Sequence, residues 1–159
     1  MPEAARPVLT TRDAAILRGL IGRFGHRADR AIGALLLCAR TVLPERIGRD
    51  IVTFHSRVAY AIEDAPPDMR IVVPSQTFTV PGMTLPVHTP RGLALLGARA
   101  GETVLARHGD GRVEPLQVLA VVYQPEAATR PSRHMADVVA FPARVREGGF
   151  AQRPGGGFQ

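Results

Sequence analysis

The pattern of apolar and polar residues changes character near residue 50 of this chain. Before that point apolar residues recur at intervals of three and four, which is typical of amphipathic helices. Ala14, Leu17, Ile21 and Phe24 follow this spacing and predict a first helix of about three turns. The preceding segment, Thr10-Thr11-Arg12-Asp13, has the form of a capping box with Asp in place of Glu.

Gly22 and Gly25 break the first helix, and a second helix is expected near Ala28–Leu43, where Pro44 ends it. The apolar positions of this second helix share one face: Ile32, Leu35, Leu36, Ala39 and Leu43. Two short amphipathic helices joined by a glycine-containing turn form an antiparallel helical hairpin, which we place at residues 10–49. Residues 1–9 show no periodic pattern, and we expect them to form a flexible arm.

From Asp50 onward the pattern predicts strands. Apolar and polar residues alternate within Asp50–Val58, and Met69–Val73 has the composition of a buried strand. Thr103–Arg107 and Val113–Tyr123 flank a segment that contains Asp110-Gly111, a dipeptide typical of hairpin turns. We therefore expect an antiparallel sheet in this part of the chain.

The stretch Thr89–Gly101 has the signals of a helix with both ends marked. Thr89 is a good N-cap, and Pro90 suits the first helical position, where no backbone N–H is needed. The predicted apolar face consists of Leu93, Ala94, Leu96 and Gly97. Gly101 allows the turn into the next strand. The chain is therefore predicted to be α+β, with a short amino-terminal helical hairpin followed by an antiparallel sheet with one helix.

Three motifs, in one order along the chain, resemble a known family. They are Asp50–Val58, the stretch Pro90–Glu102 (Pro-x-Gly-x-Ala-Leu-Leu-Gly-x-x-x-Gly-Glu), and Tyr123-Gln124-Pro125-Glu126-Ala127. Together they resemble the carboxy-terminal domain of the GreA/GreB transcription elongation factors. Within that superfamily they are most similar to the regulator of nucleoside diphosphate kinase family. The resemblance implies an FK506-binding-protein-like topology for residues 50–127.

The resemblance also implies a function, that of a non-catalytic bacterial transcription regulator in the cytoplasm. Its expected partner is core RNA polymerase, near the rim of the secondary channel. The residues expected at that contact lie on the helix and in the third motif: Pro90, Arg91, Leu95, Arg99, Tyr123, Gln124, Pro125 and Glu126. An alternative interpretation assigns four motif residues to the core: Leu93, Leu96, Gly97 and Tyr123.

The turn of the helical hairpin differs from that of the Gre factors. Those factors present acidic residues at the tip of a long coiled coil, where they help to hold catalytic Mg²⁺, a role that needs oxygen ligands. The hairpin tip here, residues 23–30, carries Arg23, Arg27 and Arg30 beside a single carboxylate, Asp29. Helices of about 13 residues also reach only about 20 Å. We therefore expect that the protein does not stimulate transcript cleavage.

All 20 basic residues are arginines, and the net charge of +6 is unevenly distributed. Residues 1–49 carry a net +5, residues 50–127 a net −2 and residues 128–159 a net +3. Nucleic-acid-binding domains usually gather charge on a folded face, so this distribution weakens that interpretation. A basic nucleic-acid-binding regulator that uses the arginine-rich ends is the alternative function. The tail, residues 128–159, is rich in Arg, Gly and Pro and is expected to be disordered.

The composition gives little support to other classes of function. The five histidines and Cys38 show no ligand spacing, so no metal or other cofactor is expected, and a single cysteine fits a reducing cytoplasm. The apolar run Ala31–Ala39 is well short of the roughly 20 residues that span a bilayer, so no membrane is expected among the partners. A prolyl isomerase or chaperone, the second alternative, would need an aromatic-lined pocket, and the chain has no Trp. The sequence does not indicate the oligomeric state.

Overall fold

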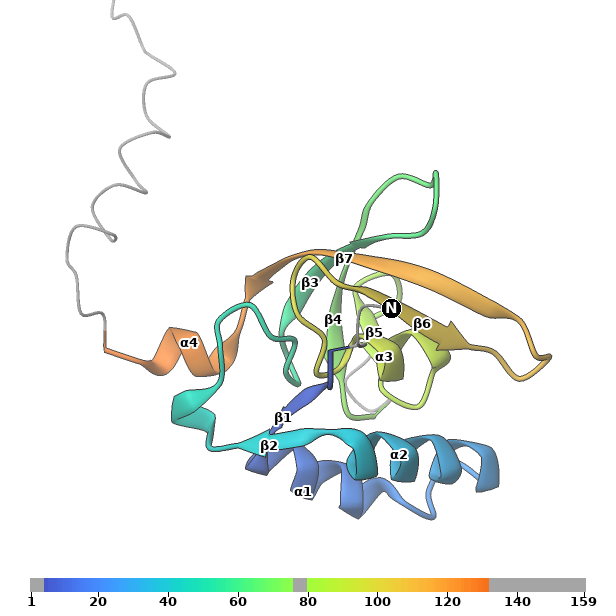
Figure 1. The fold of residues 1–159 in the computed structure, drawn as a ribbon, viewed down its shortest axis with the longest axis horizontal. Coiled ribbons are helices and arrows are strands. Elements are labelled where there is room, and N and C mark those ends of the chain that lie inside the picture. The colour runs from blue at the N-terminus through green and yellow to red at the C-terminus, as the bar shows by residue number, and fades with distance from the viewer. Residues whose placement is uncertain (1–4, 76–79, 132–159) are drawn as a thin grey trace, which may run out of the picture. The chain divides into compact units, whose positions relative to one another are not determined.

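Two helices, α1 (Thr11–Leu20) and α2 (His26–Cys38), form the helical hairpin that the sequence predicts (Figure 1). The computed structural model describes residues 5–75 and 80–131. The Thr10 hydroxyl accepts a hydrogen bond of 2.9 Å from the Asp13 amide, which confirms the predicted N-cap. Gly22 and Gly25 have φ angles of 89° and 97°, a region that favours glycine, and they turn the chain between the helices.

The ends of the hairpin differ from the prediction. Helix α2 stops at Cys38 rather than near Leu43, and strand β2 (Arg40–Val42) follows it. This strand pairs in parallel with β1 (Val8–Thr10), so the last residues of the expected flexible arm are part of a sheet. The side chains of β1 are buried, and their burial favours the strand over a free arm. A short 3₁₀ helix, η1 (Pro44–Arg46), leads out of the hairpin.

A five-stranded sheet occupies the second part of the chain, and its order is β5-β4-β3-β7-β6. The strands are β3 (Arg57–Ala61), β4 (Asp68–Val73), β5 (Thr84–Pro86), β6 (Thr103–Arg107) and β7 (Val113–Tyr123). Neighbouring strands are antiparallel except β4 and β5, which are parallel. The predicted hairpin of β6 and β7 is confirmed, as is the α+β fold class.

The segment that precedes β3 is not the strand that alternation predicted. Val52 instead pairs through its backbone with the residues that follow the helix of the second motif. Its N–H donates to the Ala98 carbonyl at 2.9 Å, and its own carbonyl accepts from the Gly97 amide at 2.8 Å. Ile51 forms an isolated antiparallel bridge with Arg99. The first and second motifs of the sequence therefore lie side by side.

Helix α3 (Pro90–Leu95) is capped by Thr89, as predicted, but it is about half the expected length. Gly97 has a φ of 83° and ends the helical path well before Gly101. At the other end Gly92 lies so close to the Pro86 carbonyl oxygen that a Cβ atom would overlap it. The backbone geometry therefore explains why glycine stands at two of the three glycine positions of the motif, 92 and 97. A last helix, α4 (Pro125–Thr129), begins the predicted tail, and residues 132–159 lie outside the described residues.

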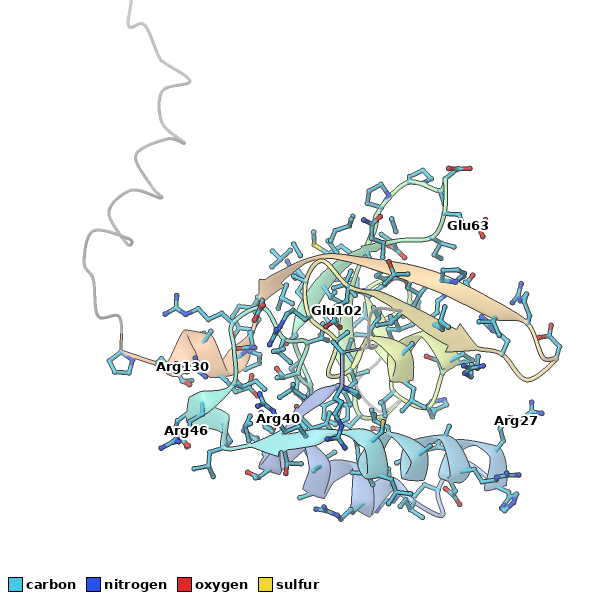
Figure 2. The ribbon with its side chains drawn as sticks, in the orientation of Figure 1. Arg27, Arg40, Arg46, Glu63, Glu102 and Arg130 are labelled. Carbon is cyan, nitrogen blue, oxygen red and sulfur yellow. The ribbon has the colours of Figure 1, made fainter. Side chains whose placement is uncertain are left out.

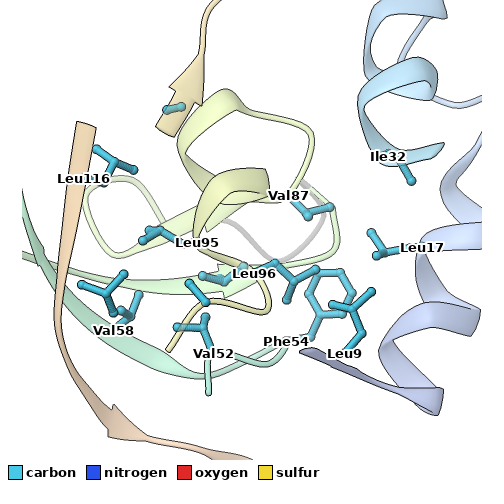
Figure 3. Packing of buried hydrophobic residues seen from close by; sticks show 14 of the residues in the cluster. Leu9, Leu17, Ile32, Val52, Phe54, Val58, Val87, Leu95, Leu96 and Leu116 are labelled. Atoms are coloured by element: carbon cyan, nitrogen blue, oxygen red, sulfur yellow. The ribbon is translucent and has the colours of Figure 1, made fainter. Parts of the chain in front are cut away.

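One hydrophobic core joins the helical hairpin to the sheet (Figure 3). Leu9, Leu17 and Ile32 from the hairpin side pack in the same cluster as Phe54 and Val87. Further buried members come from the sheet and α3: Val52, Val58, Tyr60, Val72, Leu95, Leu96, Ala106, Leu116 and Val118. The core therefore crosses residue 50, where the sequence pattern changes.

Candidate docking groove

A groove of about 620 Å³ lies between α2, α3 and β6. Ala28, Ala31 and Leu35 of α2 form one wall, and Leu93 of α3 and Leu105 of β6 contribute to the other side. The three α2 residues follow helical spacing, so this helix buries one apolar stripe in the core and turns a neighbouring one to the groove. The volume lies within the roughly 300–1,000 Å³ of typical ligand pockets.

An aromatic stack joins the hairpin to the sheet domain within the groove. The rings of Phe24 and His88 are nearly parallel, with centroids 4.2 Å apart and an interplanar angle of 13°. Burial lowers the pKa of His88, so its imidazole is neutral at pH 7. The stack therefore adds an apolar surface to the groove rather than a positive charge.

Positive charge is confined to one end of the groove. Arg27 extends from the first turn of α2 toward the turn between β6 and β7, and its guanidinium contacts Gly109 (Figure 2). Arg107, at the end of β6, lines the same region. Among the described residues that line the groove none is acidic. A complementary ligand would present apolar groups along the groove and a negative charge at this end.

Arg91 of α3 is held away from the groove by a carboxylate. Its Nε and Nη2 donate to the two carboxylate oxygens of Glu114 at 2.7 and 2.9 Å, and His108 lies 3.2 Å from the same carboxylate. These hydrogen bonds, chiefly those from Arg91, lower the pKa of Glu114 to about 2. The pair ties α3 to β7, so Arg91 has a structural role whether or not it also meets a partner.

The other contact residues expected in and after α3 differ in their exposure to solvent. Pro90 lines the groove, and Arg99 is exposed, with its Nε 3.2 Å from Asp50. Leu95 is completely buried in the core, so its expected role as a contact residue is wrong. The core interpretation is confirmed for Leu96 and Gly97, whereas Leu93 is only partly buried.

The third motif is divided between surface and interior. Tyr123 is 51% exposed, which contradicts the core interpretation for this residue. Gln124 is only 4% exposed, and its Nε2 donates to the carbonyls of Gly48 and Ile51 at 2.7 and 2.8 Å. The expected role of Gln124 at a partner contact is therefore wrong, because its amide braces the chain between hairpin and sheet. Pro125 is half-buried at the start of α4.

Glu126 belongs to a polar network that extends into the interior. The Thr53 hydroxyl donates to Glu126 Oε2 at 2.7 Å and lies 2.8 Å from the Ser56 hydroxyl. The next residue, Phe54, donates its backbone N–H to Asp13 Oδ2 at 3.2 Å. The carboxylates of α1 and α4 are thus linked through two consecutive residues of the connecting segment.

Asp13 is the electrostatic centre of this network. Its side chain is buried, and burial together with the negative charge of Glu126 raises its pKa to about 6. Sequence reasoning treated Asp13 as a capping residue only. The available signal was its position beside Ala14 and four residues before Leu17, on the apolar side of α1.

The hairpin tip does not gather its charges at one point. Arg23 and Arg30 are exposed, while Arg27 lies against the end of the groove. Asp29 Oδ1 accepts a hydrogen bond of 2.8 Å from the Gly22 amide, which uses the only carboxylate of the tip to hold the turn. Within residues 5–75 and 80–131 no group of three His, Cys, Asp or Glu side chains is placed to hold a metal ion.

Two relatives of known name show the family of this chain. It is 36% identical over 99 residues to the "Regulator of nucleoside diphosphate kinase" of Escherichia coli (strain K12), and equally to that of Shigella flexneri. The alignment covers 62% of this chain and 73% of each relative. The chain belongs to the regulator of nucleoside diphosphate kinase family. No family model matches it.

A solved structure confirms the fold of this family member. The prokaryotic transcription elongation factor GreA/GreB from Nitrosomonas europaea superposes with a TM-score of 0.61 at 24% identity. The match covers 75% of this chain and 99% of that chain. The Gre-type fold inferred from the three motifs is therefore correct.

Sequence reasoning missed most of the groove in this family member. Phe24 and Leu35 were assigned to the apolar faces of the hairpin, and His88, Leu105 and Arg107 were not singled out. The recurrence of Ala28, Ala31 and Leu35 is a usable signal, but the placement of α2 across the groove from α3 and β6 is long-range and leaves no local pattern. Among the described residues no helix has the length and hydrophobicity to cross a membrane.

Proposed function

We propose that this protein is a non-catalytic transcription regulator that docks on core RNA polymerase near the rim of the secondary channel. Family membership supports a regulatory role, since the relatives are named regulators. The Gre-type fold, which it shares with a GreA/GreB elongation factor, supports polymerase as the partner. The observation that carries the proposal is the groove: apolar walls, Pro90 at its edge, and two arginines at one end with no acidic lining residue.

The proposed contact includes the groove and two exposed motif residues that lie outside it. Pro90 and Arg27 lie in the groove, and Arg99 and Tyr123 remain available on the surface. An acidic segment with apolar side chains would match this surface in charge and in hydrophobicity. Desolvation of the apolar walls would supply affinity, and the arginines would orient the partner.

A binding assay with a matched pair of variants tests the proposal. Ala34 lines the groove and is exposed, so Ala34→Glu adds a charge and bulk there without disturbing the core. Ala15, exposed on α1, does not line the groove and gives the control Ala15→Glu. The natural chain should bind core polymerase in the low micromolar range, about −7 kcal/mol or tighter. Ala34→Glu should weaken binding by about tenfold or more, against less than about twofold for Ala15→Glu.

Two results would contradict the proposal. Absence of a complex at tens of micromolar would remove polymerase as the partner, and equal affinity of the two variants would remove the groove as the contact. If the protein bound only nucleic acid, with an affinity that falls steeply as salt is added, the basic nucleic-acid-binding alternative would be favoured. Turnover of a proline peptide would favour an isomerase, although the groove contains a single phenylalanine ring, that of Phe24.

The protein should bind without stimulating transcript cleavage. Cleavage needs carboxylates that can hold Mg²⁺, and Asp29, the only acid of the hairpin tip, already accepts the Gly22 amide. Stalled elongation complexes incubated with Mg²⁺ and excess protein should yield shortened RNA only at the intrinsic rate. A higher rate that disappears in Asp29→Asn would show that the tip is catalytic.

A further inference from the structure

A second, smaller cleft of about 290 Å³ lies away from the docking groove. Its floor is formed by Val8, Ile51 and the backbone of Gly97, and its rim carries Arg6 and Arg40. Arg99 and Glu102 complete the rim. The cleft shares no lining residue with the groove between α2 and α3.

Backbone hydrogen bonds hold the three arginine-bearing segments together. The Val8 amide donates to the Gly97 carbonyl at 3.0 Å, and the Arg40 amide donates to the Pro7 carbonyl at 2.8 Å. Gly97 permits this approach, because a Cβ atom there would lie 3.1 Å from Pro7 Cβ and 3.2 Å from the Val8 carbonyl oxygen. The convergence of the arginines is thus built into the fold rather than produced by mobile side chains alone.

The charges around the cleft are unequal. Arg99 Nε lies 3.2 Å from Asp50, and the Glu102 carboxylate accepts the Arg99 backbone amide at 3.1 Å. Asp50 therefore offsets the charge of Arg99, whereas the backbone amide orients the Glu102 carboxylate on the rim without neutralising it. Neither Arg6 nor Arg40 forms an ion pair with any residue that the structure describes. Two guanidinium groups remain to bind an anion, and guanidinium matches phosphate oxygens through paired hydrogen bonds.

We propose that this cleft binds a short chain of phosphate groups, of which pyrophosphate is the smallest example. Two arginines that form no ion pair with a described residue, with Arg99 beside them, outnumber the single carboxylate of the rim and can bind several phosphate oxygens at once. The small volume excludes a folded protein segment and suits a phosphate chain with a modest attached group. Such a chain occurs in free nucleotides and at the 5′ end of a primary transcript. The inference does not depend on docking to polymerase.

Titration calorimetry of the full chain with pyrophosphate tests the site. Arg40→Gln should weaken binding by about tenfold, and Arg6→Gln combined with Arg40→Gln should abolish measurable heat at the same concentrations. Arg46→Gln is the matched control, because Arg46 is an exposed arginine close in sequence that does not line the cleft (Figure 2). It should change affinity by less than about twofold. Unchanged melting temperatures show that the variants remain folded.

Competition separates the two sources of the phosphate chain. ATP that displaces pyrophosphate better than a 5′-triphosphorylated oligonucleotide does would identify a free nucleotide as the ligand, and the reverse order would identify an RNA end. Either order of affinity supports the site, provided that Arg40→Gln lowers the affinity for the better competitor. Equal weakening by Arg40→Gln and Arg46→Gln would overturn the proposal in favour of diffuse attraction by net charge. Absence of pyrophosphate binding to the natural chain at millimolar concentration would also overturn it.

Discussion

Replacement of Asp13 by Asn should remove a pH dependence of stability that the natural chain has between pH 5 and pH 7. The carboxylate is buried, and its pKa is raised from 3.8 to about 6. A carboxyl group whose pKa is raised on folding stabilises the folded state when protonated, and this contribution is lost as the pH rises through the folded pKa. The natural chain should therefore become more stable as the pH falls from 7 to 5.

The size of the effect follows from the two pKa values of Asp13. Each pKa unit corresponds to roughly 1.4 kcal/mol. The destabilisation that follows from the raised pKa is then about 3 kcal/mol at pH 7 and roughly half of that at pH 5, where most folded molecules hold the proton. The natural chain should gain on the order of 1 kcal/mol of unfolding free energy as the pH falls from 7 to 5, relative to Asp13→Asn. The Asn oxygen can still accept the Phe54 amide.

Urea unfolding followed by far-ultraviolet circular dichroism at pH 5, 6 and 7 measures this difference without needing tryptophan, which the chain lacks. Comparing the two proteins cancels other titrating groups, including His88, whose lowered pKa acts in the opposite direction. Glu114 does not interfere, because its contribution is lost only at much lower pH, toward its pKa of about 2.

Parallel stability curves for the two proteins would refute the assignment of a raised pKa to Asp13. Glu126→Gln provides a second test, since Glu126 raises the pKa of Asp13 by its charge. Its removal should move the natural pH dependence to lower pH, while leaving the burial contribution in place. An unchanged midpoint would mean that the charge of Glu126 does not act on Asp13.

Three further substitutions test the packing of the fold. Gly92→Ala should lower the unfolding free energy by about 1–3 kcal/mol because its methyl group would overlap the Pro86 carbonyl. Gly33→Ala within α2, where an added Cβ would have no atom within 4 Å, should raise it by about 0.5–1 kcal/mol. Equal effects of these two changes in chemical denaturation would contradict the close approach. Leu17→Ala should cost about 3 kcal/mol in a single unfolding transition detected by both circular dichroism and proteolysis, because hairpin and sheet share one core. Two separated transitions would instead show that residues 50–127 fold independently.

The sequence predicts correctly those elements whose geometry depends only on neighbouring residues. Thr10 and Thr89 cap their helices as predicted, because a hydroxyl three residues before an orphan amide determines that geometry. The hairpin of β6 and β7 follows equally from its turn residues, with Gly111 at a φ of 88°. These elements need no information from distant parts of the chain.

Elements that depend on distant partners were not predictable in the same way. Arg40–Val42 continues the apolar pattern of α2, yet it forms a strand because β1 lies beside it. Helical periodicity also failed to identify Leu95 as buried. Helix α3 has only six residues and packs between hairpin and sheet, so consecutive leucines, Leu95 and Leu96, both face the interior. Periodicity distinguishes one buried face from an exposed one only where a helix is covered on a single side.

The motifs that reveal the family and the surface that we propose for docking are largely different sets of residues. Gln124 and Glu126 brace the connecting segment, Gly92 and Gly97 allow close backbone approach, and Leu95 fills the core. Each of these roles belongs to the fold, so each would be needed whatever the protein bound. The groove takes much of its apolar lining from α2, outside the three motifs. Specificity for a partner is therefore best sought by changing α2, where the fold constrains the exposed positions least.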